Sequence, residues 1–134
     1  MEVPIEQAIQ QGVIAHREGK LQEAERVYRA ILRSHPKHPD ANHNLGLIAI
    51  SENQIEVALP LFKTALDANP NIEQFWLSYI DAIIKQKEFD NAKQVLEQAK
   101  KQGVDGEKLH SLNNLLFPIP QPKNGASTSP SQQQ

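Results

Sequence analysis

Between residues 5 and 117, apolar positions recur at the three- and four-residue spacing of an α-helix. Leu61, Ala65 and Leu66 show this spacing, and the alternation of apolar and polar residues that marks a strand is absent. Polar or glycine-containing segments separate the periodic stretches, at 19–20, 35–39, 52–54, 69–71, 87–88 and 103–106. The pattern predicts six helices of about three to four turns, joined by short turns, and therefore an all-α fold.

The helical stretches repeat with a period of 34 residues. Four residue types recur in register, and the matching positions are Gly12 and Gly46; Ala24, Ala58 and Ala92; Tyr28 and Phe62; and Pro36 and Pro70. Trp76 stands near the start of the third repeat of this period. We therefore expect three units, at 5–38, 39–72 and 73–106.

Each recurring residue type has a steric reason to recur. Two antiparallel helices approach closely only where small side chains lie at their crossing, so we expect Gly12 to face Ala24. Gly46 is expected to face Ala58 in the same way. The aromatic residue one turn beyond each alanine should fill the wider space next to the crossing. The prolines follow helix ends, because proline lacks an N–H group and has a fixed φ.

These residues resemble the signature of the tetratricopeptide repeat, which is Trp-x2-Leu-Gly-x2-Tyr, then Ala-x3-Phe, then Pro. The second unit matches best, with Leu45, Gly46, Ala58, Phe62, Ala65 and Pro70. The third unit keeps Trp76 and Ala92, but Ile80 replaces the glycine and Leu96 replaces the aromatic residue. The resemblance implies a solenoid of helix-turn-helix units.

The segment after the three units, 107–117, is expected to close the array, because a stacked array needs an end element with a polar outer face. One apolar stripe runs along it, formed by Leu109, Leu112, Leu115 and Leu116. We therefore predict one domain over 1–117 that ends in a capping helix.

Residues 118–134 differ from the rest in composition, with four of the nine prolines and four glutamines. Such a segment cannot bury enough apolar surface to offset the entropy of ordering it, so we predict a disordered linker or tail. Pro118, Pro120 and Pro122 also fit a ligand for a proline-recognising domain, although this spacing is common in spacers.

Length and charge exclude several classes of protein. The chain has 134 residues, with 14 Lys and Arg, 16 Asp and Glu, and a net charge of -2. One small domain leaves no room for most enzyme folds, and no basic surface points to nucleic acid or anionic lipid as a partner. The absence of cysteine rules out disulfides and thiolate metal sites. No apolar run has the length of a membrane span and no secretory signal is recognisable, so we expect a cytoplasmic protein without a membrane partner.

The densest group of candidate metal ligands is His35, His38, Asp40 and His43. These residues span a turn between units, whereas a metal site needs side chains that converge from several directions. Asp81 and Asp90 are candidates for an acid and base pair, but nothing in the sequence encloses them together. No phosphate-binding loop or nucleophile motif is present.

From the metal candidates and the catalytic candidates together, we predict no metal, no cofactor and no catalytic activity.

The family resemblance implies a binding surface on the inner face of the array, lined by the first helix of every unit. Such surfaces receive an extended peptide or a partner helix. Gln10, Asn44 and Ser78 lie one period apart, so they are expected to form a ladder of hydrogen-bonding groups along the groove. The predicted groove residues are Gln10, Val13, Asn44, Leu47, Ser78 and Asp81.

One well-known mode of the family captures a free carboxylate with basic residues and asparagines. The matching positions here are Ile9, Val13, Asn44, Gln74 and Ser78, so the basic residues and their charge-assisted hydrogen bonds are missing. We therefore expect no chaperone-tail receptor. The polar ladder resembles instead the asparagine-lined arrays that precede O-linked glycosyltransferase domains.

Three functions stay open on the sequence. The preferred one is a non-catalytic scaffold, monomeric or weakly self-associating, that binds a protein or peptide in its groove. The second is an assembly module, because Ile80 and the stripe of the capping segment would leave an apolar patch if the cap were loose. The third is an accessory module that presents a substrate to a linked domain. Residues 74–82 resemble the last repeat of bacterial N-terminal modules that precede glycosyltransferase, sulfotransferase or methyltransferase domains.

Overall fold

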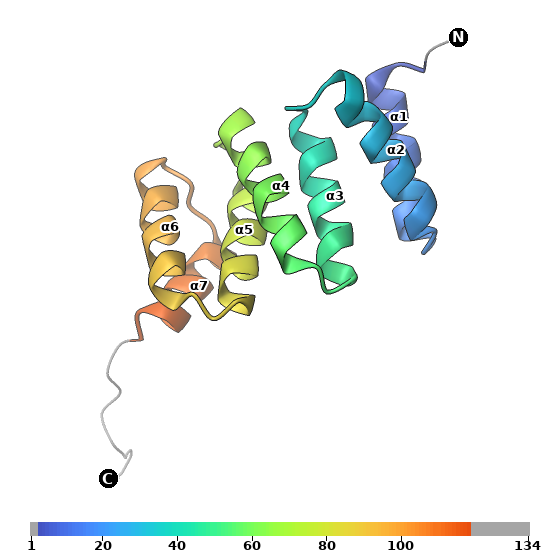
Figure 1. Ribbon diagram of the computed structural model, residues 1–134. Helices are drawn as coiled ribbons and strands as arrows, with labels where there is room; N and C mark the ends of the chain where they lie inside the picture. Colours follow the sequence, from blue (N-terminus) through green and yellow to red (C-terminus); the bar gives the residue numbers. More distant parts are fainter. Residues whose placement is uncertain (1–2, 119–134) are drawn as a thin grey trace, which may run out of the picture.

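A computed structural model describes residues 3–118 of the chain, and it contains seven α-helices within that range (Figure 1). The helices are α1 (Ile5–Arg17), α2 (Leu21–Ser34), α3 (Pro39–Ser51), α4 (Ile55–Ala68), α5 (Glu73–Lys85), α6 (Phe89–Lys101) and α7 (Glu107–Leu116). No strand occurs in this part of the chain, which confirms the all-α prediction. The predicted linker or tail, 118–134, lies outside the described residues except for Pro118.

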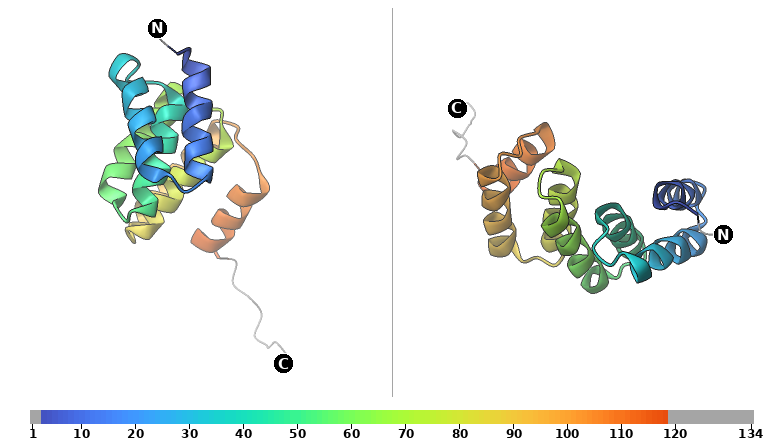
Figure 2. Two further views of the ribbon diagram at one scale, coloured as in Figure 1. Left: turned by 90° about the vertical axis from the view of Figure 1, so that its right-hand side faces the viewer. Right: turned by 90° about the horizontal axis from the view of Figure 1, so that it is seen from above.

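The helices form a curved row of antiparallel pairs, with α7 alone at the end (Figure 2). Each helix packs on the next one along the chain, and α1, α3, α5 and α7 also contact one another in that order. The first helices of successive pairs therefore lie side by side. This arrangement gives the array one continuous face made of first helices, as a tetratricopeptide solenoid requires.

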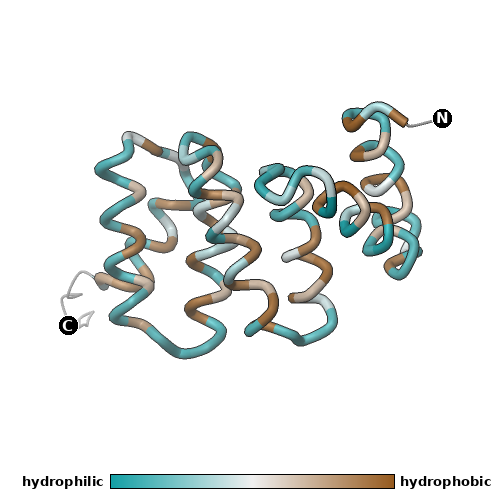
Figure 3. The backbone as a smooth tube through the Cα atoms, turned by 45° about the horizontal axis from the view of Figure 1, so that its top comes forward, coloured by the Kyte–Doolittle hydropathy of each residue, from teal (hydrophilic) through white to brown (hydrophobic). Residues whose placement is uncertain are grey.

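The apolar face of each helix is buried between neighbours, while the polar face is exposed. Figure 3 shows the corresponding alternation of hydrophobic and hydrophilic residues along the backbone. On α2, the buried side chains Ala24, Tyr28 and Ile31 follow the predicted helical spacing. Tyr28, Phe62 and Leu96 occupy equivalent positions of the three pairs, and all three are fully buried. The second helix of every pair thus inserts one large side chain against its partner.

The glycines make room for these large side chains. An added Cβ atom on Gly12 would lie 2.6 Å from Cε1 of Tyr28, and one on Gly46 would collide with the ring of Phe62. The closest atoms thus belong to the aromatic rings, and the facing of Ala24 and Ala58 stays a prediction. Helical spacing fixed the face of the helix, but the reach of the ring decides which atoms meet.

The third pair solves the same packing problem with different residues. Ile80 replaces the glycine and Leu96 replaces the aromatic ring, and both side chains are fully buried. Both side chains belong to one core cluster, so two aliphatic side chains take the place of a glycine and an aromatic ring. This unit departs from the family signature by this exchange and by Val104, which stands where the first two units have a proline.

The turn inside each pair contains one residue in the left-handed region. These residues are Gly19 (φ 78°), Asn53 (φ 61°) and Lys87 (φ 64°), one period apart. Glycine has no Cβ atom to oppose this conformation, and asparagine tolerates it better than other residues. Lys87 has neither advantage, so the third turn stores backbone strain that the first two avoid.

Candidate functional site

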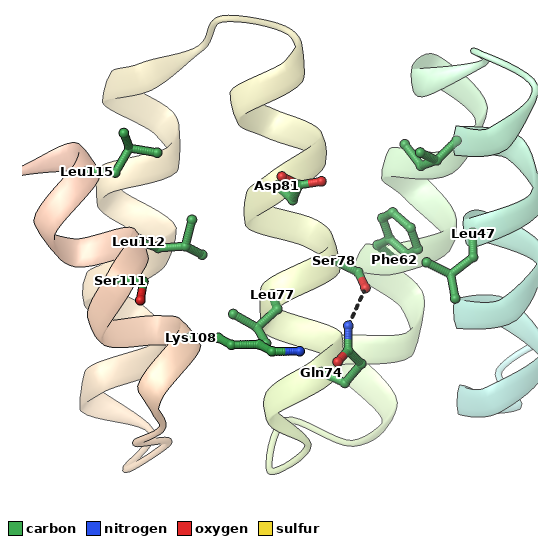
Figure 4. A pocket seen from close by; sticks show the side chains of 11 residues that line it. Leu47, Phe62, Gln74, Leu77, Ser78, Asp81, Lys108, Ser111, Leu112 and Leu115 are labelled. Carbon is green, nitrogen blue, oxygen red and sulfur yellow. Dashed lines mark hydrogen bonds between the residues drawn. The ribbon is translucent and has the colours of Figure 1, made fainter.

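A groove of about 580 Å³ lies on the face made of first helices, between α3, α5 and α7 (Figure 4). Helices α3 and α7 form its walls, α5 forms its floor, and Phe62 reaches it from α4. The lining residues are Leu47, Ile50, Phe62, Gln74, Leu77, Ser78, Asp81, Lys108, Ser111, Leu112 and Leu115. Six of these residues are apolar and five are polar, and the polar ones differ in chemistry, so the groove offers both apolar contact and hydrogen-bonding groups.

Helical spacing explains why these residues share one surface. Gln74, Leu77, Ser78 and Asp81 are separated by three and four residues on α5, which places them on one side of that helix. The lining residues of α7 have the same spacing, starting at Lys108. Three helices therefore turn equivalent faces toward a common space.

The helix α7 continues the repeat register as the first helix of a fourth unit. Advancing Gln74, Ser78 and Asp81 by one period gives Lys108, Leu112 and Leu115, and all six of these residues line the groove. The prediction of a capping helix at this position left out the part of α7 in the groove. The 34-residue shift, applied once more, was the signal that would have revealed it.

The apolar stripe of α7 divides between the core and the groove. Leu109 and Leu116 are buried against α5 and α6, with exposed fractions of 4% and 5%. Leu112 is half-buried, and Leu115 is 65% exposed at the groove wall. The capping helix therefore closes the core with two leucines and offers two to the groove.

Three of the six predicted groove residues line this groove, namely Leu47, Ser78 and Asp81. The other three, Gln10, Val13 and Asn44, lie outside its lining on α1 and α3. Gln10 is exposed, Asn44 is half-buried and Ser78 is 8% exposed. The expected ladder is therefore uneven, because its three groups differ widely in their access to a ligand.

The hydroxyl of Ser78 is engaged by two neighbours. It lies 2.7 Å from Nε2 of His43 in a buried hydrogen bond, and it accepts a hydrogen bond of 3.3 Å from the amide of Gln74, which Figure 4 shows. A group with these partners has little capacity left for a peptide. The role of Ser78 in the groove is to hold His43 and Gln74 in place.

His43 is an internal residue of the array. Its ring lies between those of Phe62 and Phe75, with centroid distances of 5.5 and 4.8 Å. Burial lowers the pKa of His43 below its ordinary value of 6.5, against the weaker opposing effects of Asn44 and Asp40. The histidine is therefore held in its neutral form, as a polar link between α3 and α5.

The other members of the His35, His38, Asp40 and His43 group do not converge with it. His38 caps α3, because its Nδ1 accepts a hydrogen bond of 3.2 Å from the backbone N–H of Ala41. His35 pairs with the hydroxyl of Ser34, and Asp40 lies in the first turn of α3. In the part of the chain that the structure describes, no three or more His, Cys, Asp or Glu side chains gather as a metal site.

Charged groups at the groove are few. Asp81 accepts a hydrogen bond of 2.7 Å from the ammonium group of Lys85, one turn further along α5. Lys108 extends from α7 toward Leu77 and Gln74 (Figure 4).

None of the helices within residues 3–118 has the length and apolar character needed to cross a membrane.

The paired helices, their shared face of first helices and the groove along it define a helical repeat protein of the solenoid class. Sequence profiles of the tetratricopeptide repeat match residues 9–54 and 49–116. The chain belongs to the tetratricopeptide repeat family. No curated protein matches it in sequence.

Several solved structures share the fold. The type III secretion translocator chaperone SycD of Yersinia enterocolitica has a TM-score of 0.70 and 15% identity, over 86% of this chain and 81% of that one. MamA of Desulfovibrio magneticus has a TM-score of 0.71 and 19% identity, over 84% and 64%. For pilF of Pseudomonas aeruginosa the values are 0.70 and 19%, over 84% and 52%, so the chain spans about half of that protein. At these identities the likeness shows a common fold.

Proposed function

We propose that this chain is a non-catalytic scaffold that binds a peptide or a partner helix in the groove between α3, α5 and α7. The observation that carries the proposal is the exposure of Leu115 opposite Leu47, on a groove whose floor includes Leu77. Apolar side chains gathered in one concave surface gain about 25 cal/mol for each Å² that a partner covers. Such a surface is typical of sites where proteins dock.

The lining suits a polypeptide better than a small polar ligand. Four leucines supply apolar contact, and the side chain of Gln74 keeps a carbonyl oxygen that can accept a hydrogen bond from a peptide N–H group. One structure of similar fold, SycD, was solved in complex with a peptide of the translocator YopD. That complex supports the proposal by analogy, since an array of this shape can hold a peptide.

We also propose that the binding surface extends from the groove toward α1. Gln10, Val13 and Asn44 lie on the first helices α1 and α3, which contact each other along the same face. A peptide longer than the groove would reach Asn44 first. The partner is then a protein segment, and the chain acts in the cytoplasm as a monomer or weak oligomer.

The proposal is tested by peptide binding to the full chain and to two variants, one in the groove and one on the proposed extension of the surface. A peptide selected from a displayed random library is titrated into the 15N-labelled protein. Perturbed amide signals are expected along α3, α5 and α7, around Leu47, Ser78 and Leu115. Leu47→Glu should weaken binding at least tenfold, because it places a charge in the apolar contact, and Asn44→Ala should weaken it less. Val57→Glu on α4, another exposed aliphatic position, is the control and should bind normally.

A second candidate function is self-association, and it rests on the apolar residues exposed at the end of the array. Leu115 is 65% exposed, and Phe117 is 38% exposed beside the ammonium groups of Lys93 and Lys100. A solution mass that rises with protein concentration would support self-association, whereas a constant monomer mass would exclude it.

A third candidate, the accessory module that presents substrates to a linked transferase, uses the same groove. It requires a transferase domain in the same open reading frame.

A further inference from the structure

We propose that Lys108 on α7 selects partner segments in which an acidic side chain accompanies the apolar ones. This inference rests on the proposed function, because it names the chemistry of the segment that the groove accepts. Lys108 lines the groove, and in Figure 4 its side chain points from α7 toward Leu77 and Gln74. The occupant is therefore expected to be an acidic, apolar peptide segment.

The charge of Lys108 is not neutralised by a neighbouring side chain. Within residues 3–118, it forms no ion pair. Lys63, Lys85 and Lys100 each pair with an acidic residue one turn away on their own helix, whereas within the described residues Lys93 and Lys101 on α6, like Lys108, do not. Lys108 thus leaves an ammonium group available at the edge of an apolar surface.

The acidic residues near the groove do not neutralise the positive charge of Lys108. Asp81 lines the groove but is paired with Lys85. It also lies two turns beyond Gln74 on α5, a separation of about 10 Å along the helix axis, which is close to the screening length at physiological salt. Glu73 lies against Gly106 and Glu107 begins α7, and neither lines the groove. The end of the groove next to Gln74 therefore favours a negative group.

Binding of a peptide segment changes the hydration free energy of the ammonium group of Lys108. The apolar side chains of Leu77 and Leu112 line the groove with Lys108, so a ligand that covers them removes water from the ammonium group as well. A carboxylate on the ligand replaces the lost hydration with an ion pair, whereas a neutral or basic group does not. The groove therefore discriminates between segments of equal apolar content by their charge.

The test is a selection of random peptides of about 12 residues, displayed on phage, against the full chain and its variants. Peptides that bind the full chain should be enriched in both leucine-like and acidic residues. Lys108→Glu should reverse the preference toward basic residues and weaken the acidic peptides about fivefold or more, with the difference shrinking at high salt. Lys101→Glu, the same charge change at the exposed end of α6, is the matched control and should keep the acidic preference.

The possible outcomes separate this inference from the proposed function. The inference fails if the selected peptides carry no excess of acidic residues, or if Lys108→Glu leaves their affinity unchanged. If Leu47→Glu still abolishes binding in that case, the proposed function of the groove is retained. If the peptides bind the Leu47→Glu variant as well as the original chain, the proposed function fails. A library that yields no binder to the full chain overturns both.

Discussion

The Nε2 atom of His43 lies 2.7 Å from the hydroxyl oxygen of Ser78, and this buried hydrogen bond joins α3 to α5. The two residues belong to different repeats, and the bond joins these repeats, as does the one from the indole of Trp76 to the carbonyl of Pro70. Phe62 and Phe75 hold the imidazole from two sides. The second and third repeats are therefore fixed relative to each other by this hydrogen bond of His43 as well as by packing, directly beneath the groove.

Removal of this hydroxyl should weaken the junction. Ser78→Ala leaves the imidazole nitrogen buried without its partner, so we expect the free energy of unfolding to fall by about 1–2 kcal/mol. Urea unfolding followed by circular dichroism measures the change. Ser111→Ala is the control, because that exposed hydroxyl bonds to the backbone of its own helix and its loss should cost less than about 0.5 kcal/mol. Equal losses in the two variants would contradict the role given to Ser78.

The burial of His43 makes stability depend on pH. Burial lowers the pKa of His43 in the folded protein, whereas the unfolded chain titrates near the ordinary value of 6.5. Below that value the unfolded state binds the proton more readily, so the free energy of unfolding should fall as the pH drops from 6.5 toward the lowered pKa.

Urea unfolding at about pH 7.5 and about pH 5.5 tests this pH dependence. His43→Gln cannot titrate and should show a smaller loss at the acidic pH. An undiminished loss in the His43 variant would show that other groups cause it.

Adjacent leucines of α7 are expected to behave in opposite ways. Leu116→Ser puts a hydroxyl into the core and should cost about 2–4 kcal/mol of stability. Leu115→Ser changes an exposed side chain, so stability should stay within about 0.5 kcal/mol while the affinity for a groove-binding peptide falls. Thermal unfolding and fluorescence anisotropy measure the two effects. Normal peptide binding by the Leu115 variant would remove α7 from the binding surface.

The close contact of Gly46 with Phe62 predicts a steric conflict. Gly46→Ala gains helix propensity of about 1 kcal/mol, but its methyl group meets a ring that is fully buried and cannot move aside. We expect a net loss of about 1–3 kcal/mol. The double variant with Phe62→Leu, which imitates the Ile80 and Leu96 pair of the third repeat, should recover part of it. Additive effects in this double-mutant cycle would refute a direct contact.

The left-handed backbone at Lys87 offers a stabilising substitution. Lys87→Gly should raise the free energy of unfolding by about 0.5–1 kcal/mol, because glycine adopts this conformation without steric cost. Gln86→Gly is the matched control, since Gln86 has ordinary helical φ and ψ angles and should gain nothing. Urea titration resolves both changes, and equal effects would disprove the strain at Lys87.

The fold was predictable from the sequence because the residues that recur do so for steric reasons. Small residues such as Ala24 and Ala58 recur where helices cross, and they are fully buried as expected. The site was predicted less well. The three groove residues found on α3 and α5 followed from the repeat register, but Lys108 and Leu115 were missed because α7 was interpreted as a cap.

The position of His43 could not be read from the sequence. It stands close to exposed polar residues of a turn, and the pattern there gives no sign that an imidazole enters the core. Its burial is decided by Ser78 and Phe75, which come from the next repeat. A contact across repeats depends on how the repeats stack, and periodicity within one helix does not describe that.

One wall of the groove is the last helix of the array, with neighbours on one side among the described residues. Terminal elements of a linear array fray before its interior, so the backbone amides of α7 should exchange with deuterium faster than those of α3 or α5. A ligand that binds only the docked state of α7 must slow this exchange in proportion to its affinity. The opening of the end of the solenoid and the binding of the partner would then be linked in one equilibrium, so that each opposes the other.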